Sequence, residues 1–190
     1  YSSWQDYWRH SDPFKEISFW HSSYVNKKFD VIGYKGDETR DAAYQVNRIV
    51  KEMSKGKYKQ MSDSLVAVNL KLLIHMVGDM HCPCHIFYTE FDDCFSHTKP
   101  DGKKVRRHDQ MKVYYNGKKT TSHRVWDGLS IRQIWPEFGP DYEKFRVALD
   151  KMSPKKQAKM CKGTIEEGVL QNAKDCRYIY DDITPGCKID

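Results

Sequence analysis

The chain has 190 residues, of which 39% are hydrophobic and 13% aromatic, and its formal net charge is +6. Such a composition excludes an intrinsically disordered protein and allows one domain with a substantial buried core. No apolar run approaches the roughly 20 residues that cross a bilayer, so no transmembrane segment is predicted. The positive charge favours polyanionic partners such as nucleic acids, although a soluble basic protein without such a partner would have the same balance.

The N-terminal half of the chain is predicted to be helical apart from one irregular segment. Residues 1–10 are typical of the end of an aromatic-rich helix, and residues 19–24 form an extended or irregular segment that carries His21. Residues 37–54 are predicted to form a helix because their apolar residues recur at near-helical spacing. The apolar residues of the next helix, over residues 65–77, lie nearly all round it, which predicts a buried central helix.

The pattern changes in the C-terminal half. Residues 86–121 are predicted to form a long loop with one short β-hairpin, because an aromatic run precedes Asn116 and Gly117. Three helices are predicted after this loop, over residues 122–133, 141–151 and 164–180. The chain is therefore predicted to have a mainly α fold in a single domain over residues 1–190.

Two pairs of histidine and aspartate share a spacing of four residues. His75 and Asp79 form the first pair and His123 and Asp127 the second, and on a helix each pair projects from one face. His85 follows shortly after Pro83, a residue that is expected to end the first helix. Nitrogen and oxygen ligands of this kind suit zinc, so the pattern predicts a multinuclear metal site.

The six cysteines fit an oxidising compartment and up to three disulfide bonds, so a secreted or periplasmic protein is expected. Cys176 and Cys187 bracket a turn-forming loop and could close it by a disulfide bond. Cys82 and Cys84 lie beside the candidate metal ligands, so their thiolates are alternative ligands of zinc.

Four sequence blocks, in this order, resemble the zinc-dependent single-strand nucleases of the nuclease S-one/P-one family. They are residues 3–9, 20–21, 75–85 and 122–127. The resemblance is strongest over residues 3–128, and by it the chain starts near the second helix of the family pattern and stops before its last. It implies a helical domain of the phospholipase C and single-strand nuclease type, in which a basic loop at about residues 95–121 is an insertion.

The resemblance also implies the ligands of the metal ions. A first zinc would be held by Asp6, His21, His75 and Asp79, and a second by His85, His123 and Asp127. The family's third zinc uses an N-terminal tryptophan amine and a nearby histidine that have no counterpart here, so two to three zinc ions are expected. Asp6 would also activate the attacking water, and Arg9 would contact the phosphate. Tyr24 and Asn26 lie near the position of the family's nucleobase pocket.

By this resemblance the chain is expected to be a zinc-dependent phosphodiesterase that cleaves single-stranded DNA or RNA to 5′-phosphorylated products. Its activity would extend to 3′-nucleotides, and no stable protein partner is implied. Closely spaced zinc ions suit this reaction because they activate water and neutralise the phosphoryl oxygens. Two alternatives remain: a phospholipase C-like zinc hydrolase, and a catalytically impaired protein that binds zinc or nucleic acid.

Overall fold

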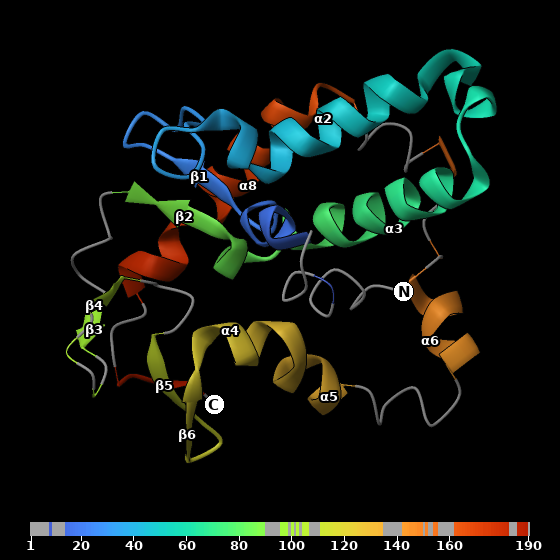
Figure 1. The fold of residues 1–190 in the computed structure, drawn as a ribbon. Coiled ribbons are helices and arrows are strands. Elements are labelled where there is room, and N and C mark those ends of the chain that lie inside the picture. The colour runs from blue at the N-terminus through green and yellow to red at the C-terminus, as the bar shows by residue number, and fades with distance from the viewer. Residues whose placement is uncertain are drawn as a thin grey trace.

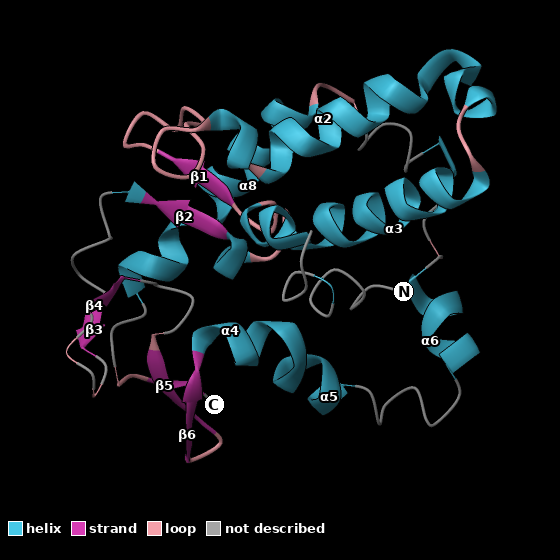
Figure 2. Ribbon diagram, viewed as in Figure 1, coloured by secondary structure: helices cyan, strands magenta, loops and turns pink. Residues whose placement is uncertain are grey.

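The computed structural model describes residues 8, 14–89, 96–98, 100, 102, 104–106, 111–134, 142–149, 151, 154–155, 162–182 and 186–189. This part of the protein is mainly helical with a few short strands (Figures 1 and 2), which confirms the predicted fold class. Within it, no helix has the length and apolar character needed to cross a membrane. Apart from Trp8, the helix end predicted over residues 1–10 lies outside the described residues.

Three long helices build the first part of the core. They are α2 (Ala42–Met53), α3 (Asp63–Asp79) and α8 (Ile165–Asp182). Helices α2 and α3 run side by side, and α8 packs against α2 (Figure 1). Their shared core is a cluster of small and aliphatic side chains, namely Ile17, Ala42, Ala43, Val46, Ile49, Leu72, Met76, Met80 and Val169. The near-helical spacing of the apolar residues in α2 is what places one face of this helix in the core.

Helix α2 begins later than the sequence predicts. A short 3₁₀ turn, η2 (Glu38–Arg40), precedes it, and the backbone of Asp41 is then extended, with φ −136° and ψ 141°. The Asp41 side chain accepts a hydrogen bond from the backbone N–H of Ala43, which is the usual way an aspartate caps a helix. The predicted helix over residues 37–54 is therefore a 3₁₀ turn followed by a helix that begins at Ala42.

Helix α3 is only partly buried, so the prediction of a buried central helix was wrong. Its buried residues are Asn69, Leu72, His75 and Met76, which recur at steps of three and four and form one face. Four apolar side chains elsewhere on the helix are 42–59% exposed, namely Leu65, Leu70, Ile74 and Val77. When apolar residues lie all round a helix, the sequence does not specify how many of its faces pack against other elements. Here one face of α3 packs against the core that it shares with α2.

Within the described residues the strands form three small sheets. Strand β1 (Ser23–Val25) pairs in parallel with β2 (Ile86–Tyr88), and β3 (Ser96–Thr98) pairs with β4 (Lys104–Arg106) in antiparallel fashion. In the third sheet β5 (Lys112–Tyr115) lies between β6 (Lys118–Thr121), which is antiparallel to it, and β7 (Lys188–Ile189), which is parallel. The antiparallel pair β3–β4 is an addition to the predicted single hairpin.

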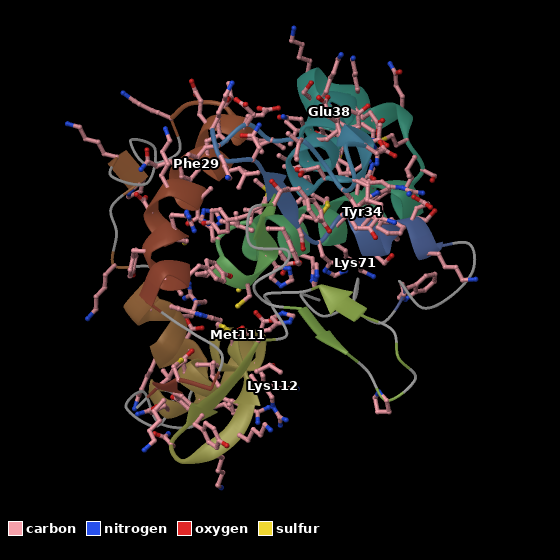
Figure 3. The ribbon with its side chains drawn as sticks, turned by 90° about the vertical axis from the view of Figure 1, so that its left-hand side faces the viewer. Phe29, Tyr34, Glu38, Lys71, Met111 and Lys112 are labelled. Atoms are coloured by element: carbon pink, nitrogen blue, oxygen red, sulfur yellow. The ribbon has the colours of Figure 1, made fainter. Side chains whose placement is uncertain are left out.

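The predicted hairpin is confirmed as β5 and β6. Asn116 and Gly117 both have positive φ, 48° and 72°, as a tight two-residue hairpin turn requires. Met111 and Lys112, labelled in Figure 3, lie at the start of β5, where Met111 is buried and Lys112 exposed. Met111 belongs to a second core that joins the strands to α8, with Val25, Ile86, Tyr88, Val113, Val125, Ala173 and Tyr180.

The remaining helical elements are short or interrupted. They are η1 (Phe14–Phe19), η3 (Ser54–Gln60), η4 (Pro83–His85), α4 (Ser122–Arg124), η7 (Val125–Leu129), α5 (Ser130–Ile134) and α6 (Tyr142–Leu149). The predicted helix over residues 122–133 is present as α4 and α5 joined by the π-helical turn η7. Such turns inside α-helices frequently occur at functional sites, and this one carries Asp127. The helices predicted over residues 141–151 and 164–180 correspond to α6 and α8.

Candidate metal centre

The end of α3 and the start of β1 bring three candidate ligands together. Oδ2 of Asp79 lies 3.0 Å from Nδ1 of His21 and 3.0 Å from Nε2 of His75. The two histidine nitrogens are also 3.0 Å apart, and both side chains are buried. His75 and Asp79 meet because they are one helical turn apart on α3, whereas His21 arrives from a segment 54 residues earlier than His75. We call these three residues the first ligand group.

The geometry of the first ligand group fits a dication. Neighbouring ligands of a tetrahedral zinc ion are about 3.3 Å apart when the bonds are about 2.0 Å long. The three atoms of the group form a triangle with edges close to that length. Burial raises the pKa of Asp79, but hydrogen bonds from His21 and His75 outweigh it and bring this pKa to about 2. The carboxylate is therefore ionised at neutral pH, as a ligand of zinc must be.

A second ligand group lies at the turn after α3 and at the start of α4. Nε2 of His123 is 3.1 Å from Nε2 of His85 and 2.5 Å from Oδ2 of Asp127. Nε2 of His85 is 3.9 Å from the same carboxylate oxygen. Sγ of Cys82 is 3.4 Å from the other oxygen of Asp127. Two imidazoles, a carboxylate and a thiol form a donor set that suits zinc.

The charges of the second ligand group are also those of a cation site. Burial raises the pKa of Asp127, but hydrogen bonds from His123 and His85 hold it well below its usual range. Hydrogen bonding with Cys84 and burial raise the pKa of the Cys82 thiol, so this thiol is neutral unless a cation binds to it.

The two ligand groups are adjacent, and Asp79 links them. While Oδ2 of Asp79 contacts the first group, its Oδ1 lies 3.8 Å from Nε2 of His85 in the second. The rings of His21 and His85 are stacked with their centroids 6.2 Å apart. A carboxylate with one oxygen facing each group is the arrangement by which neighbouring metal ions share a ligand.

The parallel pairing of β1 and β2 explains why His21 and His85 meet. Ser23 pairs with Ile86 at the start of the two strands. His21 lies two residues before Ser23, and His85 lies one residue before Ile86, so both histidines reach the same end of the strand pair. The buried Asp41 side chain fixes β1 further, because it accepts hydrogen bonds from the Ser23 hydroxyl and from the backbone N–H of Tyr24.

Helix α8 supports the turn that carries Cys82 and His85. The Tyr180 hydroxyl donates a 2.6 Å hydrogen bond to the backbone oxygen of Pro83. Nδ2 of Asn172 donates a 2.6 Å hydrogen bond to the backbone oxygen of Met80. These bonds hold the chain on either side of Cys82, and such support orients the ligands of a metal site.

The other predicted site residues are placed as follows. Asp6 and Arg9 lie outside the described residues. Tyr24 stacks on Phe87 with ring centroids 5.0 Å apart and also contacts Tyr34, which is labelled in Figure 3.

The side chain of Asn26 is used within its own turn. Its oxygen accepts hydrogen bonds from the backbone N–H groups of Lys28 and Asp30, and its nitrogen donates to the Asp30 carboxylate.

The predicted disulfide bond between Cys176 and Cys187 is not present in the structure, so this prediction was wrong. Both residues are free thiols, as are Cys82 and Cys84. Cys176 is buried within α8, where its thiol donates to the side-chain oxygen of Asn172. Spacing around a turn was the only signal for the bond, and it does not reveal which way a helical side chain points. Cys94 and Cys161 lie outside the described residues.

Comparison with known proteins gives the family of the chain. No curated protein matches the sequence significantly. The family described as S1/P1 Nuclease matches residues 1–188 of the chain, nearly its whole length. That range contains both ligand groups and the elements that carry them. The chain therefore belongs to the S1/P1 nuclease family.

Proposed function

We propose that the protein is a zinc-dependent phosphodiesterase that cleaves single-stranded DNA or RNA and also acts on 3′-nucleotides. The observation that carries the proposal is the pair of adjacent ligand groups, both of which Asp79 faces. Membership of a nuclease family supplies the reaction class. The ligand groups supply the reason for zinc, since each combines imidazole nitrogens with a carboxylate.

Bound zinc would supply a nucleophile at neutral pH and neutralise the charge of the phosphoryl oxygens. Each residue of the chain then has its own task. His21, His75 and Asp79 would hold one ion, and His85, His123 and Asp127 the other. Family resemblance assigns the remaining tasks to two residues near the N-terminus. The Asp6 carboxylate would accept a proton from the attacking water, and the Arg9 guanidinium would pair with the phosphate oxygens. Cleavage of the bond between phosphorus and the 3′-oxygen leaves a 5′-phosphate on the product.

The nucleic-acid substrate is supported by charge and by the position of one aromatic residue. The chain carries a net charge of +6, and Lys112, Lys118 and Lys119 are exposed on the hairpin of β5 and β6. The resemblance places Tyr24 near a nucleobase pocket. In the structure Tyr24 is on β1, the strand that directly follows the segment with His21. Aromatic rings stack on bases of any sequence, which suits binding to single strands. Secretion or a periplasmic location stays a prediction from the cysteine content.

The proposal is tested with a labelled single-stranded oligonucleotide and protein purified without chelator. Elemental analysis of the same sample should give two or more zinc ions per chain. A chelator should abolish cleavage, added zinc should restore it, and mass spectrometry should find 5′-phosphates on the products. Hydrolysis of phosphatidylcholine without cleavage of the oligonucleotide would overturn the proposal in favour of a phospholipase.

Two histidine variants distinguish the loss of a metal ligand from the nonspecific effect of replacing a histidine. His75→Ala removes a ligand of the first group, and cleavage should fall at least about 100-fold. His81→Ala is the matched control, because His81 is an exposed histidine in the next turn of the chain and belongs to neither ligand group. Its activity should stay within about twofold of the wild type. Equal losses in the two variants would contradict the assigned role of His75.

A further inference from the structure

The structure distinguishes between the two cysteines that flank Pro83. Sγ of Cys82 lies 3.4 Å from Oδ1 of Asp127. It also lies within 4.8 Å of a ligand atom of His85. Cys84 is 1% exposed, and its thiol contacts Cys82, Ser122 and Tyr180 and lies near His123. Of these two cysteines, Cys82 is the one whose sulfur forms a cluster with ligand atoms of His85 and Asp127.

The local backbone explains this choice. Pro83 and His85 bound the 3₁₀ turn η4, and Cys82 is its N-cap, with φ −86° and ψ 124°. The backbone N–H of His85 donates to the oxygen of Cys82 at 3.0 Å, which closes the turn. Cys82 and His85 therefore lie at the two ends of one tight turn, and their ligand atoms lie within 4.8 Å of each other. A spacing of two residues between ligands is also the usual spacing of short zinc-binding loops.

The distances match those expected around one metal ion. With a zinc–sulfur bond of about 2.3 Å and a zinc–oxygen bond of about 2.1 Å, tetrahedral geometry separates sulfur and oxygen by about 3.6 Å. Two nitrogen ligands are separated by about 3.3 Å in the same geometry. The observed values are 3.4 Å for Cys82 and Asp127 and 3.1 Å for His85 and His123. The ligand atoms of Cys82, His85 and Asp127 all lie within 4.8 Å of one another, and His123 adjoins them through His85 and Asp127.

We propose that Cys82 is a ligand in the second ligand group, so that Cys82, His85, His123 and Asp127 bind one metal ion together. This inference rests on the proposed function, since it concerns the same metal centre. When the ion binds, the S–H bond of Cys82 breaks, a sulfur–metal bond forms and the proton passes to solvent. The site then has four protein ligands, two neutral and two anionic, which balance the charge of a divalent ion.

A thiolate ligand would change the metal selectivity of the second site and the access of substrate to its ion. Soft sulfur favours zinc over hard cations such as magnesium and calcium, so the second site selects zinc by chemistry. Four protein ligands also fill a tetrahedral shell, whereas catalytic zinc sites usually keep one position open. A fourth protein ligand would therefore leave less room beside the ion for an oxygen of the substrate. Cys82 thereby limits the access of substrate to this ion.

Cobalt substitution tests the inference, because a cobalt–thiolate bond produces an intense charge-transfer absorption in the near ultraviolet that oxygen and nitrogen ligands do not produce. Wild-type protein freed of metal and titrated with cobalt(II) should develop this band. Cys82→Ser should lose it, while Cys84→Ser and Cys187→Ser should keep it. Cys187 is included because it lies just before β7, away from both ligand groups, so that one control remains if the buried Cys84 position does not tolerate serine.

The zinc affinity of the same variants provides a second test. In competition with a chromophoric chelator, Cys82→Ser should bind one of its zinc ions about 10- to 100-fold more weakly and leave the other unchanged. A charge-transfer band that persists in Cys82→Ser, or is absent from the wild type, would overturn the inference. Cleavage of single-stranded DNA by the zinc-loaded wild type is measured separately. Retained cleavage without the band would refute the role of Cys82 and leave the proposed function intact.

Discussion

Asp41 allows a quantitative prediction, because it is a buried carboxylate that is hydrogen-bonded to β1, the strand next to the first ligand group. Its oxygens accept hydrogen bonds from Ser23, Tyr24 and Ala43, and so it joins the start of α2 to the strand that follows His21. Burial raises the pKa of Asp41 from 3.8 to about 6, although these hydrogen bonds oppose the rise. We therefore predict that the ionisation of this one residue makes the protein less stable at neutral pH than at mildly acidic pH.

The sign and size of the effect follow from proton linkage. Below a pH of about 3.8 the folded and unfolded states both bind the proton, and the stabilising contribution is complete. Between the two pKa values only the folded state holds it, and the contribution disappears as the pH rises through about 6. One pKa unit corresponds to about 1.4 kcal/mol, so this shift amounts to about 3 kcal/mol in total. About 2 kcal/mol of it falls between about pH 4.5 and about pH 7.5.

The assay compares urea unfolding of the wild type and Asp41→Asn at those two pH values. Asparagine is uncharged, so the stability of the wild type relative to the variant should fall by about 2 kcal/mol as the pH rises. Titration of all other groups cancels in this double difference. Asp37→Asn is the control, because Asp37 also caps a helical turn but is exposed, and a hydrogen bond from the Thr39 side chain lowers its pKa. A double difference for Asp41 near zero, or of opposite sign, would refute the reasoning.

Three further substitutions test the site and its supports. Asp79→Asn removes the charge that both ligand groups face, so zinc affinity measured by competition should fall at least about 100-fold; unchanged binding would argue against a shared ligand. Gly33→Ala would place a Cβ 2.1 Å from the backbone oxygen of Asp37 at a φ of +70°, and the free energy of unfolding in urea should fall by about 2 kcal/mol or more. Tyr180→Phe leaves the buried oxygen of Pro83 without its hydrogen bond, which should cost about 1–3 kcal/mol in thermal unfolding; an unaltered midpoint would show that the bond contributes nothing.

The helices were predictable from sequence to the extent that local patterns determine them. The elements at residues 142–149 and 165–182 match their predictions closely because their amphipathic spacing has one interpretation. The start of α2 was placed too early, since the extended backbone of Asp41 depends on hydrogen-bond partners in β1 that no local pattern reveals. The burial of α3 was overestimated for a related reason. An apolar helix has several faces that could be buried, and only the tertiary fold decides which of them finds a partner.

The same holds for the candidate site: contacts between residues close in the sequence were predictable from local patterns, and contacts between distant segments were not. Each pair at a spacing of four, such as His75 and Asp79, was visible in the sequence because one helical turn determines it. That His21 joins this pair depends on the parallel pairing of β1 with β2, two strands of three residues without a strong sequence signal. This pairing also brings His85 beside His21 and so places the two ligand groups next to each other. Family resemblance can therefore name the ligands and divide them between two ions, but the register of a strand pair is what places the two groups next to each other around Asp79.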